Sequence, residues 1–127
     1  MAEMATYVGV FNRTAIAQVA GGNIARGLRI TRQADGTFIV TATNATRGDM
    51  VSLGLIEGGK PGPAVSASGG GKVPAVAAVA VNMGDLAYSA ANGQFTNVAT
   101  GAQLMGRFTQ PASGAGVLTE VELLDVA

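Results

Sequence analysis

Short runs of β-branched and apolar residues, separated by turn signals, most limit what this chain can fold into. The clearest run is 37–43, which is dense in Thr, Ile, Val and Phe, residue types that are enriched in strands. The run follows Asp35-Gly36, a pair that supplies the positive φ of a tight hairpin turn. We therefore predict a hairpin of residues 27–32 with 37–43. Several such strands at spacings of about 8–12 residues are typical of a small barrel or sandwich.

The last third of the chain has the same strand-and-turn pattern. Ala91-Asn92-Gly93 is a hairpin signal that leads into an expected strand at 94–98. We also expect a short strand at 104–108, a Pro- and Gly-containing loop at 110–116 and a strand at 117–123. In the last strand one face is apolar and formed by Val117, Thr119, Val121 and Leu123. The predicted fold class is mainly β: a small barrel or sandwich of short antiparallel strands with an extended N-terminal arm.

Residues 1–22 differ from the rest and are predicted to form that N-terminal arm, with residues 23–127 as one β-rich domain. Between Thr6 and Phe11 both alternating faces are apolar, as in a strand that is covered on both sides. Residues 14–20 are compatible with a short helical turn, which Gly21 would end. The arm residues that we expect to contact a partner are Thr6, Tyr7, Val8, Val10 and Phe11.

The segment 58–72 is rich in Gly and Pro. This composition predicts an exposed, mobile loop without a packed element. The apolar, Ala-rich run at 74–81 that follows fits a buried strand or a short helix equally well.

Charge excludes several classes of partner. Charged residues make up 13% of the 127 residues, and eight basic residues balance eight acidic ones. Nucleic-acid-binding proteins usually carry a basic surplus, so we expect no nucleic-acid partner. The apolar stretch 73–81 is shorter than the roughly 20 residues that cross a bilayer, so no membrane partner is expected. Net charge near zero favours association, which predicts a subunit whose surface is covered in an assembly; a neutral monomer is the alternative.

Few residues here are able to do chemistry. The chain has no His and no Cys, which removes imidazole and thiolate metal sites, a Cys nucleophile and a Ser-His-Asp triad. Glu120 and Glu122 lie two apart on one strand face, but the solvent-facing side of an edge strand explains them more simply. Gly69-Gly70-Gly71-Lys72 lacks the spacing of a phosphate-binding loop. We expect no catalytic residue, no cofactor, no metal site and no enzymatic activity.

Half of the basic residues fall within one stretch of the first third of the chain. A partner with an acidic surface would suit them, although solvated or intramolecularly paired arginines are the simpler interpretation. Strand alternation places Arg26 and Arg32 on one face and Arg29 on the other, so no single basic stripe is expected. The four candidate contact residues are Arg13, Arg26, Arg29 and Arg32.

The second half carries a series of short motifs in a fixed order. They are Gly84-Asp85-Leu86-Ala87-Tyr88, Ala91-Asn92-Gly93-Gln94-Phe95-Thr96, Leu104-Met105-Gly106-Arg107 and Gly114-Ala115-Gly116-Val117, followed by the alternating final strand. This order resembles the capsid decoration, or cement, proteins of tailed bacteriophages. The resemblance covers residues 24–125, and the Gly-rich segment 58–72 departs from it.

The resemblance implies a homotrimeric, β-rich structural protein of the virion without an active site. Such a protein is made in the host bacterial cytoplasm, binds the major capsid protein on the outer capsid surface and stabilises the contacts between capsomers. The apolar arm would add a strand to a sheet edge on the shell. Two alternatives stay open: another phage structural subunit (a tail or fibre component), and a β-rich ligand-binding module, for which six aromatic residues without Trp are few.

Overall fold

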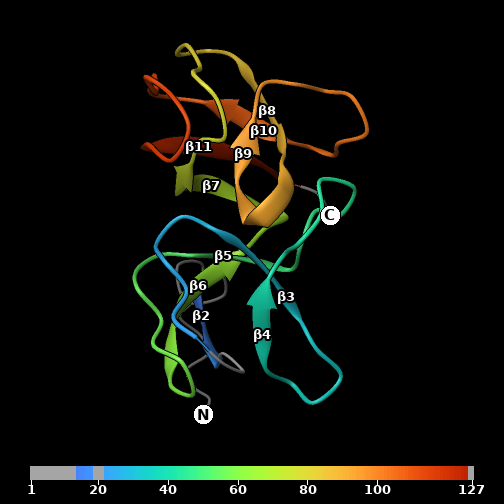
Figure 1. Cartoon of the computed structure of the whole chain (residues 1–127), viewed down its shortest axis with the longest axis vertical. Coiled ribbons are helices and arrows are strands. Elements are labelled where there is room, and N and C mark those ends of the chain that lie inside the picture. Colours follow the sequence, from blue (N-terminus) through green and yellow to red (C-terminus); the bar gives the residue numbers. More distant parts are fainter. Residues whose placement is uncertain (1–13, 19–21, 126–127) are drawn as a thin grey trace.

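Two five-stranded sheets, one from each half of the chain, make up the fold (Figure 1). The computed structural model describes residues 14–18 and 22–125. The N-terminal sheet has the order β2-β6-β5-β3-β4 and the C-terminal sheet the order β7-β11-β10-β8-β9. Paired strands within both sheets are antiparallel. The predicted class, mainly β with short antiparallel strands, is confirmed.

The N-terminal sheet contains the hairpin that the sequence predicts. Ile30 pairs with Val40 and Arg32 with Phe38. At the turn Gly36 has a φ of 88°, which explains the need for glycine there, and its N–H donates to the Gln33 carbonyl over 3.0 Å. The strands of this sheet are β2 (Thr14–Gln18), β3 (Arg29–Arg32), β4 (Phe38–Val40), β5 (Met50–Ser52) and β6 (Pro61–Ser66).

The C-terminal sheet follows the expected alternation most closely. Thr119, Val121 and Leu123 are buried on one face of the last strand, as predicted. The turn at Asn92, with a φ of 58°, joins two paired strands and confirms the predicted hairpin. The elements are β7 (Gly69–Val76), β8 (Leu86–Ser89), the 3-10 turn η1 (Ala91–Gly93), β9 (Phe95–Thr96), β10 (Leu104–Phe108) and β11 (Leu118–Asp125).

The prediction of a structureless loop at 58–72 is wrong, because most of this segment lies in β6 and β7. The two prolines of β6 are tolerated because they lie beyond Ala64, where the pairing of β6 with β5 ends. They are two residues apart, so their missing N–H groups lie on the same side of the strand. The Leu53 N–H donates to the Pro63 carbonyl over 3.1 Å, which places that side towards β5. The N–H groups of Gly62 and Ala64 point to the other side of β6, where these two residues pair with Ala17 and Ala15 of β2. The run at 74–81, left open as strand or helix, continues β7 as far as Val76.

The predicted arm is only partly separate from the domain. Residues 14–18, whose sequence is compatible with part of a helical turn, form β2 instead and pair with β6. A helix of one or two turns is marginal in water, whereas β6 offers a complete edge of main-chain partners. Residues 1–13 lie outside the described residues, and with them Thr6, Tyr7, Val8, Val10, Phe11 and Arg13.

Two hydrophobic clusters stabilise the molecule, and the larger one spans both halves. The smaller cluster lies in the N-terminal sheet and contains Ile24, Ile30, Phe38, Ile56 and Ala64. The larger one is centred on the C-terminal sheet, with Phe95, Met105 and Phe108, but also contains Val51 and Val65 of the N-terminal sheet. The two sheets therefore share apolar contacts along the long axis of the molecule (Figure 1).

Candidate functional site

Arg29, one of the four arginines predicted to contact a partner, is completely buried. Its guanidinium donates from Nε to the Gln94 carbonyl oxygen and from Nη1 to that of Arg47, each over 3.1 Å. Further hydrogen bonds reach the carbonyl oxygens of Thr46 and Ala90. Burial lowers the pKa of Arg29 to about 10.

Arg29 is therefore an internal cross-link, and its prediction as a partner contact is wrong. The physical reason is that β3 is covered on both faces at this point, since Arg29 and Ile30 are both completely buried. The carbonyl oxygens around the guanidinium supply its hydrogen-bond acceptors inside the protein. Arg26 and Arg32 are exposed. The guanidinium carbon of Arg32 lies 5.9 Å from the centroid of the Phe38 ring.

The two carboxylates singled out by the sequence both lie on β11 and differ in their surroundings. Glu120 is half-buried and its Oε1 accepts a hydrogen bond from Thr109 Oγ1 over 2.6 Å. Glu122 is exposed on the same strand. Over residues 14–18 and 22–125, no group of three His, Cys, Asp or Glu side chains is placed to hold a metal ion. In the same ranges no helix is long and apolar enough to cross a membrane.

The outer face of the C-terminal sheet carries exposed leucines, which the sequence reasoning did not identify as a site. Leu118 is 47% exposed, Leu86 41%, Leu124 39% and Leu104 36%. Leu118 lies on the opposite side of β11 from the buried Val121 and Leu123. The alternation of β11 in the sequence could therefore have identified Leu118 as an exposed leucine. Large apolar side chains gathered on one exposed face mark a surface for contact with another protein.

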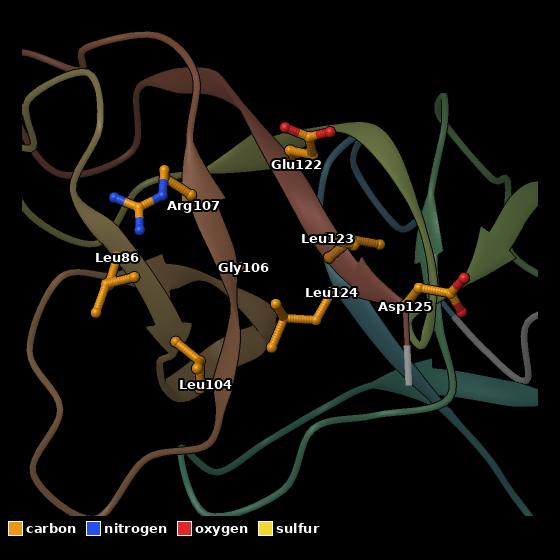
Figure 2. Close-up of a pocket in the computed structure, with 8 residues that line it drawn as sticks. All are labelled: Leu86, Leu104, Gly106, Arg107, Glu122, Leu123, Leu124 and Asp125. Carbon is orange, nitrogen blue, oxygen red and sulfur yellow. The ribbon is translucent and has the colours of Figure 1, made fainter. Parts of the chain in front are cut away.

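A hollow of about 280 Å³ lies among three of these leucines (Figure 2). Leu86, Leu104 and Leu124 surround the bare main chain of Gly106, and the rest of the lining includes Arg107, Glu122 and Asp125. The register of β10 against β8 shifts between Leu104 and Gly106, and both Met105 and Gly106 are buried. Because this bulge turns two successive residues inward, no side chain covers the outer face between Leu104 and Arg107.

The hollow combines exposed apolar side chains with charged groups. Its centre is apolar and open, and its charged groups, Arg107, Glu122 and Asp125, stand at its margin. A rim of charge around apolar anchors is the usual arrangement of protein interfaces.

Comparison with known proteins gives a similarity of fold. No family model matches the chain, and no curated protein matches its sequence. A solved structure, the N base of head fiber gp8.5 from bacteriophage phi29, is similar over 88% of this chain and 93% of that one. The TM-score is 0.66 and the sequence identity 16%. The chain thus shares the fold of the base of a phage head fibre.

Proposed function

We propose that this chain is a structural protein of a bacteriophage head, which binds the outer surface of the capsid and stabilises the contacts between capsomers. In this role it is a homotrimer that binds the major capsid protein, and it catalyses no reaction. The observation that carries the proposal is the similarity of nearly the whole fold to the base of a phage head fibre. The motif order in residues 84–117 supports the same setting independently.

The arrangement of the N-terminal sheet supports a role for the arm. Among the described strands, β2 is the outermost of the N-terminal sheet, and the edge of a sheet is a common place for pairing with another chain. The arm residues Thr6–Phe11 are separated from β2 by two residues in the sequence. We propose that they add a strand to a sheet on the shell, where main-chain hydrogen bonds provide affinity. Many identical copies, each bound weakly, would together hold a shell firmly.

The test is binding to expanded phage heads assembled without this protein. Purified full chain is mixed with the heads, which are then sedimented, and the bound copies are counted by gel densitometry and located by electron microscopy. The proposal predicts saturable binding to regularly spaced positions on the outer surface. Absence of binding, or binding only at the tail, would contradict it; the second result would favour the tail component.

A deletion of residues 2–12 tests the arm separately. The deleted chain should keep the far-UV circular dichroism spectrum and the oligomeric mass of the full chain, because β2 and the two clusters remain. Its binding to heads should be lost. Unchanged binding would show that another surface contacts the shell, and would leave the capsid role itself intact.

A further inference from the structure

Opposite charges lie side by side on the outer face of the C-terminal sheet. Glu122 of β11 is opposite Lys72 of β7 on one side and opposite Arg107 of β10 on the other. Within the described part of the chain, the Glu122 carboxylate has no hydrogen-bond or ion-pair partner. Arg107 donates from Nη1 to the Gly84 carbonyl oxygen over 2.6 Å, and the other N–H groups of its guanidinium remain available for a partner.

These charges flank the leucine hollow on two different sides. Glu122 and Asp125 come from β11, whereas Arg107 comes from β10 (Figure 2). Leu86, Leu104 and Leu124 lie around the hollow itself. Among the residues that line the hollow, the acidic groups therefore lie on the β11 side and the basic group on the β10 side, and Lys72 of β7 lies outside this lining, beyond Glu122.

A patch of this kind is complementary to another copy of itself. A partner of uniform charge would be attracted by one side of the patch and repelled by the other. An identical patch, rotated about an axis that passes near the hollow, brings its basic side against the acidic side of its neighbour. This holds for a twofold and for a threefold axis. The net charge of zero adds no overall repulsion between copies.

We propose that copies of this chain meet at the hollow around Gly106, with Glu122 of one copy facing Arg107 of the next. The exposed leucines of the hollow, Leu86, Leu104 and Leu124, are buried at the same contact. The inference rests on the homo-oligomer of the proposed function and names the surface that forms it.

Charge reversal tests this contact. The full chain and the variants Arg107→Glu, Glu122→Arg and the double variant are compared by light scattering coupled to size exclusion, over a range of concentrations. The full chain should have a mass that is a multiple of 12.6 kDa. Each single variant places like charges together and should weaken association by at least about tenfold, and the double variant should restore it.

Three results would overturn the proposal: a single-chain mass for the full chain, an unchanged mass for both single variants, or no restoration in the double variant. Both substituted side chains are exposed, so the variants should fold, which circular dichroism checks. Lys60→Glu is the matched control, because Lys60 is an exposed basic residue outside the patch. Its mass should equal that of the full chain.

A second pair of variants, one inside the patch and one outside it, tests the apolar part of the patch. Leu104→Ser should weaken association, whereas Leu55→Ser should not, although Leu55 is more exposed, at 59% against 36%. Equal effects of the two substitutions would contradict the proposed position of the contact.

Binding to heads separates this inference from the proposed function. If the charge-reversal variants keep their mass but lose binding to heads, the patch contacts the shell, and the inference fails while the function stands. If the full chain associates through the patch but binds no heads, the function fails and the inference stands.

Discussion

The guanidinium carbon of Arg29 lies 5.9 Å from the centroid of the Phe95 ring. Arg29 belongs to β3 in the N-terminal sheet, and Phe95 to β9 at the edge of the C-terminal sheet. The same guanidinium donates to the carbonyls of Ala90 and Gln94, on either side of the turn η1. One buried side chain thus ties the hairpin of the second half to a strand of the first.

Replacing Arg29 should destabilise the whole protein. Arg29→Met keeps much of the apolar volume but removes the donor of the Thr46, Arg47 and Ala90 carbonyl oxygens, whereas the Gln94 carbonyl keeps the Ala90 N–H. A buried carbonyl left without a donor costs about 1–3 kcal/mol before relaxation. We expect the free energy of unfolding to fall by about 2–4 kcal/mol in urea denaturation. Arg26→Met, at an exposed position, should change it by no more than about 0.5 kcal/mol. Equal stability of the two variants would contradict the cross-link.

Ser89 provides a second hydrogen-bonded link between the two halves of the chain, in addition to Arg29. Its Oγ donates to the Asn44 carbonyl oxygen over 2.6 Å and accepts from the Gln103 N–H over 2.8 Å, and Ser89 is completely buried. Ser89→Ala should lower the free energy of unfolding by about 1–2 kcal/mol, because both main-chain groups lose a partner. The exposed Ser113→Ala is the control and should leave the urea midpoint unchanged.

Gly106 should not accept a larger side chain. A Cβ atom at this position would lie 2.0 Å from the carbonyl oxygen of Glu122, on the neighbouring strand β11. Gly106→Ala must therefore separate β10 from β11, and we expect a loss of more than about 3 kcal/mol or failure to fold. Gly114→Ala has nothing within 4 Å of the added atom and should be close to neutral. Thermal unfolding followed by circular dichroism compares them; a neutral Gly106→Ala would show that the strands separate easily.

Two aspartates at the surface, the exposed Asp35 and the half-buried Asp85, should make stability depend on pH in the acid range. Hydrogen bonds from the Thr37 side chain and main chain lower the pKa of Asp35, and those from the Asn82 main chain and the Asn97 side chain lower that of Asp85. A carboxylate with a lowered pKa in the folded state contributes stability above its unfolded pKa, 3.8. That contribution is lost as the pH falls below this value through the folded pKa.

The double variant Asp35→Asn/Asp85→Asn checks this pH dependence. Its melting temperature should fall less than that of the unchanged chain between about pH 5 and pH 3. The melting temperatures of the two proteins should differ least at the lowest pH, because the carboxylates of the unchanged chain are then also neutral. Parallel curves over the whole range would contradict the role of these two side chains.

Local patterns in the sequence determined the strands that have a clear alternation and a strong turn. Asp35-Gly36 and Ala91-Asn92-Gly93 predicted both hairpins, since positive φ values are a local requirement of the backbone. The alternation from Val117 to Leu123 predicted which face of β11 is buried. These features depend on neighbours in the sequence and need no knowledge of distant residues.

Tertiary structure alone decided the features that depend on residues far apart in the chain. The Gly- and Pro-rich segment 58–72 became two strands because β2, β5 and β11 offer partners for it, and strand formation depends on such neighbours more than on composition. Arg29 is buried because carbonyls from residues 46, 47, 90 and 94 surround it. The hollow at Gly106 arises from a bulge in the pairing of β10 with β8. A short stretch of sequence encodes its own alternation and turns, whereas the acceptors, strand edges and register that surround it are contributed by the rest of the fold.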